Sequence, residues 1–253
     1  MNDKPLLIVQ ARTGSIRLTK KMVRPFYKEK TIPQIIIENL LRHFDSDQIV
    51  LATSTNKGDD ELEELCLIIG INCFRGSEDN VLKRFIDCAN HFNAKRLVRI
   101  CADNPFVLPE YIFELTNELV DSSKEYASFK WKDNTPVLLS HIGVFVEAMT
   151  LGFLKKIQNS TKDPFYLEHV TNYIYDHKNQ FDHIFLSLPK ILDDRGNIRL
   201  TVDTKEDFSL AQEIYEKIKM KTKDYHLLDL IELIDENPVL KLRMKAQIKE
   251  NAK

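Results

Sequence analysis

The feature that most constrains the fold is a regular alternation of short apolar runs and amphipathic stretches through the first half of the chain. The apolar runs lie at residues 6–9, 48–53, 72–74 and 97–102. Between them, apolar residues recur three and four positions apart, as they do on one face of a helix. Strands that alternate with helices are joined by right-handed crossovers into a mostly parallel sheet. The first half therefore predicts an α/β fold.

The second half is less regular, and mixed or antiparallel strand pairing is expected there. Strands are predicted at residues 126–129, 144–146, 184–186 and 198–202, and helices at 146–157, from about 164, at 208–218, at 227–234 and from 239. Gly70 is predicted to end one helix of the first half, and Pro109 to begin another. Because no repeat or linker-like segment divides the chain, residues 1–253 are expected to form one domain.

The composition excludes several classes of function. Charged residues make up 29% of the chain, hydrophobic residues 43%, and the net charge is −2. Such a chain has no general electrostatic attraction for nucleic acid or for anionic membranes. No apolar run approaches the length of a membrane span, and no signal-peptide pattern is present. We therefore expect a cytoplasmic protein with no nucleic-acid and no membrane partner.

The first apolar run is followed at once by a basic loop rich in small residues, ARTGSIRLTKK. Arg12, Arg17 and Lys21 can neutralise phosphate oxygens, while Gly14 and Ser15 let backbone N–H groups approach them. Open α/β sheets bind their ligands where strands end at the carboxyl side. The loop matches neither the P-loop pattern GxxxxGK[ST] nor the dinucleotide pattern GxGxxG. We interpret it as a triphosphate cradle; the alternative is a solvated basic loop.

Two aspartates stand at the ends of later apolar runs. Asp103 lies in the sequence ADNP and Asp203 in LTVDT. Carboxylates at such positions can share one Mg²⁺ ion that also contacts substrate phosphates. The structural alternatives are a turn at Asp103 and a helix N-cap at Asp203.

Candidates for binding a second substrate are fewer. Glu168 and His169 follow an aromatic pair and can face a substrate, and His141 is a weaker candidate. For each of them the alternative is a purely structural role. The chain has no HExxH motif, no GxSxG motif and no plausible cysteine nucleophile, so hydrolase chemistry of those kinds has no support.

Several stretches together resemble a known family. They are QARTGSIRLTKK, IVLATSTN, FRGSEDNVLKRF, RICADNPFVLPE, EHVTNYIY, RLTVDTKEDF and LIELIDENPVL, in that order along nearly the whole chain. On these motifs the chain resembles the cytidylyltransferase-like glycosyltransferase-A group. It is most similar to the spore-coat polysaccharide biosynthesis type, which is related to acylneuraminate and 3-deoxy-manno-octulosonate cytidylyltransferases. The resemblance implies a Rossmann-like mixed, mostly parallel sheet flanked by helices, CTP as donor, Mg²⁺ as cofactor, pyrophosphate release and a homodimer.

The same resemblance implies roles for individual residues. The nucleotide site would comprise Ala11, Arg12, Thr13, Gly14, Ser15, Arg17, Lys21, Ser54, Thr55, Arg75, Ser77 and Asn80. The catalytic residues would be Arg12, Lys21, Asp103 and Asp203, of which the two aspartates bind the metal. The acceptor would contact His141, Glu168 and His169, within an acceptor-binding and dimerisation region at residues 130–180. Residues 220–253 are expected to form C-terminal helices.

The chain departs from the family pattern in two places that bear on the substrates. At residues 18–21 the sequence LTKK replaces the common Leu-Pro-Gly-Lys, which exchanges backbone rigidity and turn permissiveness for a cation. At residues 138–143 the sequence LLSHIG replaces a Gly-rich acidic segment. In addition, no arginine lies between Arg99 and Arg195, so this region offers no guanidinium fork for an acceptor carboxylate, only point charges such as Lys130, Lys132 and Lys162.

The expected reaction is CTP-dependent transfer of CMP to a small-molecule acceptor with release of pyrophosphate, in surface polysaccharide or glycoconjugate biosynthesis. Two alternatives stay open. One is the same chemistry on a phosphate- or phosphonate-bearing acceptor, which would give a CDP-type product. The other is a non-catalytic nucleotide-binding protein of the same fold. The sequence by itself barely distinguishes CTP from UTP or ATP.

Overall fold

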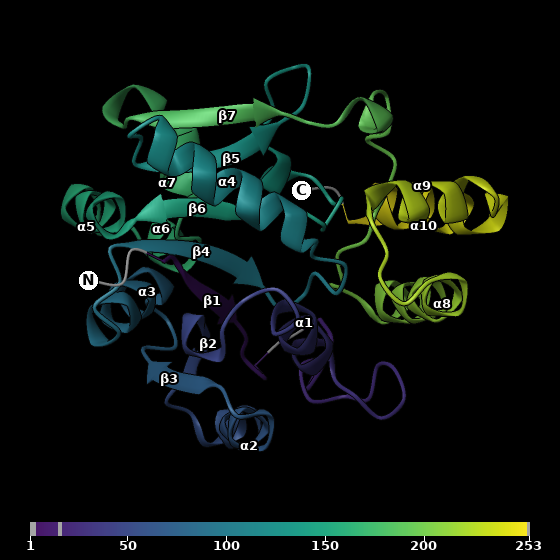
Figure 1. Cartoon of the computed structure of the whole chain (residues 1–253), viewed down its shortest axis with the longest axis horizontal. Coiled ribbons are helices and arrows are strands. Elements are labelled where there is room, and N and C mark those ends of the chain that lie inside the picture. Colours follow the sequence, from purple (N-terminus) through teal and green to yellow (C-terminus); the bar gives the residue numbers. More distant parts are fainter. Residues whose placement is uncertain (1–3, 15–16, 252–253) are drawn as a thin grey trace.

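The computed structural model describes residues 4–14 and 17–251. Its centre is a seven-stranded sheet in the order β3-β2-β1-β4-β6-β5-β7 (Figure 1). The strands are β1 Leu6–Gln10, β2 Ile49–Ser54, β3 Asn72–Gly76, β4 Arg96–Cys101, β5 Tyr126–Lys130, β6 Glu147–Thr150 and β7 His183–Ser187. Neighbours among β1 to β4 are parallel, β6 is antiparallel to both β4 and β5, and β7 is parallel to β5. The predicted mixed, mostly parallel sheet is confirmed.

Helices cover both faces of this sheet. They are α1 Ile32–Leu40, α2 Asp60–Ile69, α3 Val81–His91, α4 Pro109–Asp121, α5 Leu151–Ser160, α6 Pro164–Glu168, α7 Asn172–Asp176, α8 Lys205–Lys221, α9 Leu227–Asp235 and α10 Pro238–Glu250. Short 3₁₀ turns are η1 Ser46–Gln48, η2 Lys57–Asp59, η3 Val137–Leu139, η4 Lys178–Gln180 and η5 Lys190–Leu192. Among the described residues, no helix is long and apolar enough to cross a bilayer.

Side chains of β1 alternate between two apolar cores, one on each face of the sheet. Leu7 and Val9 pack with residues of α1, α2, α4, α8, α9 and α10. Leu6 and Ile8 pack with residues of α3, α5 and α7 on the opposite face. The strand is therefore buried on both faces and apolar from Leu6 to Val9, as the sequence indicated.

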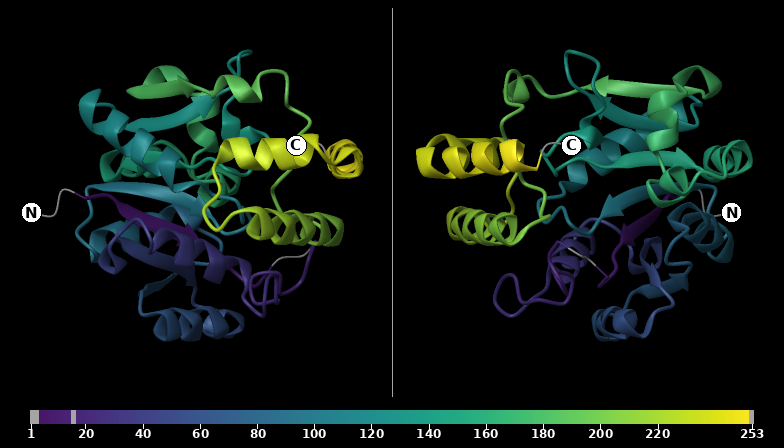
Figure 2. Two further views of the ribbon diagram at one scale, coloured as in Figure 1. Left: turned by 45° about the vertical axis from the view of Figure 1, so that its right-hand side comes forward. Right: turned by 180° about the vertical axis from the view of Figure 1, so that it is seen from behind.

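The carboxyl ends of β1, β4, β5 and β7 lie at the same edge of the sheet, because β6 alone among the described strands runs in the reverse direction. The C-terminal helices α8, α9 and α10, drawn in yellow-green and yellow, gather beyond this edge (Figures 1 and 2). The edge therefore collects the loops that follow these strands.

Several helix ends follow from single residues. The Thr31 side chain caps α1 by accepting a hydrogen bond from the backbone N–H of Gln34. Gly70 ends α2 with a φ of 83°, a left-handed conformation that favours glycine. Pro109 lies in the first turn of α4. A backbone N–H at this position would have no partner within the helix, so the proline costs no helical hydrogen bond. The predicted helix end at Gly70 and helix start at Pro109 are confirmed.

Three predictions for the second half were wrong. The strand expected at 144–146 is β6 at Glu147–Thr150, and the helix expected from 146 begins only at Leu151, because Thr150 ends the strand and caps α5. Residues 198–202 form no strand. The backbone N–H of Leu200 bonds to His141 O, and that of Val202 bonds to Asp103 O, so this segment joins two loops instead of a sheet ladder.

Candidate active site

Two adjoining cavities lie at the carboxyl ends of β1 and β4. The first cavity, of about 510 Å³, is lined by the opening loop, the end of β4, Glu168, His169 and Asp203. The second cavity, of about 550 Å³, lies between the end of β4, the segment 137–145 and the helices α6 and α7. Six residues line both: Arg17, Arg99, Cys101, Asp103, His169 and Asp203. The two predicted metal-binding aspartates are thus on the boundary between two compartments.

Asp203 is held in place by two arginines. Its Oδ1 accepts a hydrogen bond from Arg17 Nη2 at 2.9 Å, and its Oδ2 accepts one from Arg199 Nη2 at 3.3 Å. Arg199 is buried and also donates to both carboxylate oxygens of Asp207, at 2.6 and 2.7 Å. Burial opposes the charge of Asp207, but the Arg199 fork outweighs it and lowers the pKa of that carboxyl.

Asp103 is joined to the same segment through Lys21. Lys21 Nζ lies 4.0 Å from Asp103 Oδ2 and donates to the backbone oxygen of Val202 at 2.6 Å. The backbone oxygen of Asp103 accepts from the N–H of Val202 at 2.8 Å. These contacts tie the end of β4 to residues 202–203, so both carboxylates are presented to one space.

The pair Asp103 and Asp203 fits a Mg²⁺ ion. The described residues contain no cluster of three or more potential metal-ligating side chains. Mg²⁺ nevertheless binds commonly through one or two carboxylates, with waters and substrate phosphates as its other ligands. The Asp103 side chain is one-third exposed, and Arg17, which pairs with Asp203, has a side chain that is 65% exposed.

The opening loop is anchored by a buried carboxylate. Asp59 Oδ1 accepts hydrogen bonds from the backbone N–H and the hydroxyl of Thr13, both at 2.7 Å. Asp59 Oδ2 accepts from Thr53 and Ser54 at the end of β2. Burial raises the pKa of Asp59, but the donors, led by Ser54 and Thr13, outweigh it and lower that pKa below 3.8. Thr13 and Ser54 therefore shape the loop from outside the cavity.

Five residues of the opening loop that were predicted to bind the nucleotide line the first cavity. Ala11, Arg12, Gly14, Arg17 and Lys21 line the first cavity. Arg12 Nη2 donates to Glu168 Oε1 at 2.7 Å, which connects the loop to the end of α6. The predicted residue Ser15 lies outside the described residues.

Four other residues predicted to bind the nucleotide, Thr55, Arg75, Ser77 and Asn80, lie outside the described lining of the two cavities. Arg75 donates to Ser54 O at 3.0 Å and pairs with Asp60 and Glu63. Asn80 caps α3, and Ser77 accepts from the Asn80 N–H. The Thr55 N–H bonds to Gly76 O. Within the described residues, Thr55, Arg75, Ser77 and Asn80 line neither cavity, and their nucleotide role stays a prediction.

The predicted acceptor residues have different surroundings. His169 lines both cavities, and Glu168 lines the first. His141 is buried, with Nδ1 at 2.5 Å from Arg199 Nη1. His141 thus supports the arginine that holds Asp203, while Glu168 and His169 face the open space.

Several polar residues of the site were not predicted from the sequence, and three of them are Arg99, Gln10 and Arg199. Arg99 and Gln10 line the first cavity, and Arg199 orients Asp203. The available signal was a charged or amide side chain inside an otherwise apolar strand, LLIVQ or RLVRIC. Charged and amide side chains are rarely fully buried without a hydrogen-bond partner, so each such residue in a strand indicates a polar site near the end of that strand.

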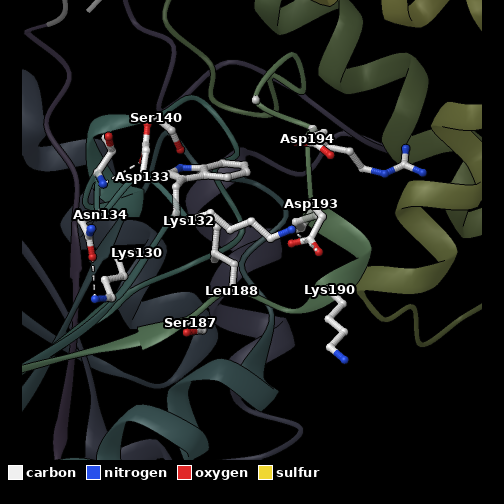
Figure 3. A pocket seen from close by; sticks show the side chains of 15 residues that line it. Lys130, Lys132, Asp133, Asn134, Ser140, Ser187, Leu188, Lys190, Asp193 and Asp194 are labelled. Carbon is white, nitrogen blue, oxygen red and sulfur yellow. Dashed lines mark hydrogen bonds and ion pairs between the residues drawn. The ribbon is translucent and has the colours of Figure 1, made fainter.

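A larger cavity, of about 890 Å³, lies at the carboxyl ends of β5 and β7 (Figure 3). Trp131 lines it, beside the ion pair of Lys132 Nζ and Asp193 Oδ2 at 2.8 Å. This large cavity shares Ser140 with the second cavity, but no described residue lines both the large cavity and the first cavity. Because this space reaches neither Asp103 nor Asp203, its size does not make it the reaction site.

A mixed sheet with a cationic loop that faces Asp103, after the end of β4, and Asp203 is the arrangement expected of a nucleotidyltransferase. A model of the cytidylyltransferase family matches residues 6–230, and the chain belongs to that family. It is 33% identical to the spore coat polysaccharide biosynthesis protein SpsF of Bacillus subtilis over 94% of this chain and 96% of that protein. An uncharacterized protein of Methanocaldococcus jannaschii is 35% identical, over 92% and 91% of the two chains.

Among solved structures, a cytidylyltransferase from Leptospira borgpetersenii superposes with a TM-score of 0.83. It is 26% identical and covers 94% of this chain and 96% of its own. The predicted family, fold class and enzyme class are therefore confirmed.

Proposed function

We propose that the protein transfers CMP from CTP to a small-molecule acceptor and releases pyrophosphate, in surface polysaccharide or glycoconjugate biosynthesis. The observation that carries this proposal is the position of Asp103 and Asp203 on the boundary of two cavities, with the cations of the opening loop on one side. A nucleotide triphosphate in the first cavity and an acceptor in the second would meet at these carboxylates. Family membership supports CTP, and the relationship to SpsF supports the pathway.

The residues of the first cavity suit the leaving group. Attack of an acceptor oxygen on the α-phosphorus forms a new P–O bond and breaks the bond to the pyrophosphate. Arg12, Arg17 and Lys21 would bind the pyrophosphate oxygens, so catalysis would rest on positioning and charge neutralisation. Asp103 and Asp203 would hold Mg²⁺, which when bound neutralises charge around the α-phosphate. Arg17 would then release the Asp203 carboxylate and bind a phosphate oxygen in its place.

Pyrophosphate release tests the proposal. The protein is incubated with Mg²⁺, each of the four nucleoside triphosphates, and sugar acids, phosphorylated acceptors or phosphonates. We expect release with CTP, and loss of release when EDTA removes the metal. Thermal-shift measurements with the same nucleotides should show the largest stabilisation by CTP. Nucleotide binding without release on any acceptor would favour the non-catalytic alternative, and a larger shift with UTP or ATP would overturn the choice of nucleotide.

Replacing Asp103 by Asn tests the metal-binding assignment. We expect turnover to fall by about 10²- to 10³-fold, the usual cost of losing one group that stabilises charge in the transition state. Thermal unfolding should stay unchanged, because among the described residues the Asp103 carboxylate makes no hydrogen bond and has only an ionic contact with Lys21 at 4.0 Å. The exposed Asp47, changed to Asn, is the control for the charge change. Near-normal turnover at saturating Mg²⁺ would contradict the assignment.

We also propose that each chain forms one nucleotidyltransferase domain and that two chains form a cytoplasmic homodimer. The dimer contact would lie within residues 130–180. Two large apolar side chains of this region support the contact: Leu139 is 38% exposed and Phe165 is 50% exposed. Both line the second cavity, so a partner that covered them would help to close the acceptor side.

A further inference from the structure

Arg99 lies at the floor shared by the two cavities. It is on β4, where it is the cross-strand partner of Glu147 on β6. The Arg99 side chain is 14% exposed, and it lines both cavities. In the sequence Arg99 only marks the start of the segment without arginine, yet the fold brings its guanidinium into the acceptor-side cavity.

The partners of Arg99 fix its orientation without using all of its donors. Nη1 donates to Glu147 Oε1 at 2.5 Å and to Thr171 Oγ1 at 3.4 Å, and Nε donates to Gln10 Oε1 at 3.1 Å. Within the described part of the chain, Nη2 makes no hydrogen bond, and it is not among the buried polar atoms without a partner. One nitrogen of a rigidly held cation that lines both cavities therefore has no protein acceptor among the described residues.

Glu147 has no capacity left for a ligand. It is fully buried, its Oε1 also accepts from Thr171 Oγ1 at 2.9 Å, and its Oε2 accepts from Tyr126 at 2.6 Å. This carboxylate is satisfied entirely by the protein. Its effect on the cavity is therefore indirect, through the arginine that it holds.

The sheet itself does not require this ion pair. The neighbouring pair on the same face of the ladder, Leu97 and Met149, is apolar. A buried ion pair loses hydration that roughly offsets its attraction, so well-packed apolar residues serve stability equally well. Burial disfavours the charge of Arg99, but Cys101 and Glu147 outweigh it and raise its pKa, so the guanidinium stays charged. A charged, half-satisfied side chain here points to a ligand.

The other candidate cations lie elsewhere. Lys130 and Lys132 line the large cavity of Figure 3, where they contact Asn134 and Asp193. Lys162 is exposed and does not line the described part of the second cavity. Arg17, the remaining arginine in that lining, is paired with Asp203.

We propose that Arg99 determines acceptor specificity by binding an anionic group of the acceptor, a carboxylate or a phosphoryl group, through Nη2. The inference rests on the proposed function, since it takes the second cavity as the acceptor site. Gln10 and Glu147 act as positioning residues that hold the guanidinium plane. Acceptor and leaving group would then be bound by different cations, the acceptor by Arg99 and the pyrophosphate by Arg12, Arg17 and Lys21.

Binding measurements with defined probes test this inference. The enzyme is saturated with Mg²⁺ and an α,β-methylene analogue of CTP. It is then titrated by calorimetry with N-acetylneuraminate, glycerol 3-phosphate or glycerol, which separate carboxylate, phosphate and neutral ligands. The test variant, Arg99→Met with Glu147→Gln, removes both charges of the buried pair and leaves the net charge unchanged. Lys132→Met with Asp193→Asn removes an ion pair of the large cavity and is the matched control.

We expect at least one anionic probe to bind wild type, and the Arg99/Glu147 variant to bind it about 10- to 100-fold more weakly, as for a lost charge-assisted contact. Arg99→Lys should restore part of the affinity, and the control variant should bind like wild type. Failure of both anionic probes to bind wild type, or unchanged binding in the Arg99/Glu147 variant, would overturn the inference. An equal loss of CTP-analogue affinity would place Arg99 in the nucleotide site instead. Failure of wild type to bind the CTP analogue would count against the proposed function itself.

Discussion

Among the single residues, the carboxylates of the site fall into two groups that differ in their surroundings. Asp207 and Glu147 each hold an arginine, Asp59 holds the opening loop, and Asp103 and Asp203 face the cavities. Each of the first three is saturated by donors inside the protein. Asp103 and Asp203 instead line both cavities, where we propose that they bind the metal.

Replacing Asp59 by Asn should destabilise the protein in a pH-dependent way. Because the pKa of Asp59 is lowered in the folded state, its contribution is complete above the unfolded value of 3.8 and is lost as the pH falls through the folded pKa. We expect the variant to lose about 1–3 kcal/mol at pH 7, because Thr13 and Ser54 lose a charged acceptor. The difference from wild type should shrink below pH 3.8.

Urea unfolding at pH 7 and at acid pH measures this effect, with Asp47→Asn as a control for surface charge. Equal unfolding free energies of wild type and variant at pH 7 would contradict the structural role of Asp59.

At the scale of elements, the ion pair between Arg12 and Glu168 joins the opening loop to the end of α6. In the proposed function, the loop binds the nucleotide and α6 borders the acceptor site. This ion pair would then link the two substrate sites, and Glu168 would compete with a phosphate for the Arg12 guanidinium.

Replacing Glu168 by Gln should strengthen CTP binding. The carboxylate competes with phosphate for Arg12, and an exposed pair of this kind contributes about 0.2–1 kcal/mol, so we expect an increase in affinity of about 1.5- to 5-fold. Calorimetric titration with Mg²⁺ and CTP measures it. Glu216→Gln, an exposed change on α8, is the control. Weaker CTP binding in the Glu168 variant would show that this carboxylate assists the nucleotide.

At the scale of the whole molecule, the acceptor side is bordered by exposed apolar side chains. If residues 130–180 form the dimer contact, Phe165→Ser should shift the protein toward the monomer, because an aromatic anchor at an interface is replaced by a small polar group. Light scattering during size-exclusion chromatography measures the mass. Val120→Ser, at a 48% exposed position on α4, is the control. A monomeric wild type, or an unchanged mass of the Phe165 variant, would contradict the proposed dimer contact.

The second half of the chain shows where local pattern stops predicting structure. The apolar run at 198–202 has strand-like composition, but its backbone partners are the carbonyls of His141 and Asp103 on two distant loops. Glu147 begins a strand although its charge is unfavourable in one, because Arg99 of β4 lies opposite to it. In both cases the deciding partner is remote in sequence.

The α/β alternation, the cationic opening loop, the two aspartates and the family could all be predicted from the sequence, because these depend on local periodicity and on contiguous motifs. Which polar residues line the cavities and which support the scaffold became clear from the three-dimensional arrangement. Thr13, Ser54 and His141 support the site from behind, whereas Arg99 enters it. The physical reason is that a buried polar group takes its role from its hydrogen-bond partners, and those partners come from other strands and loops.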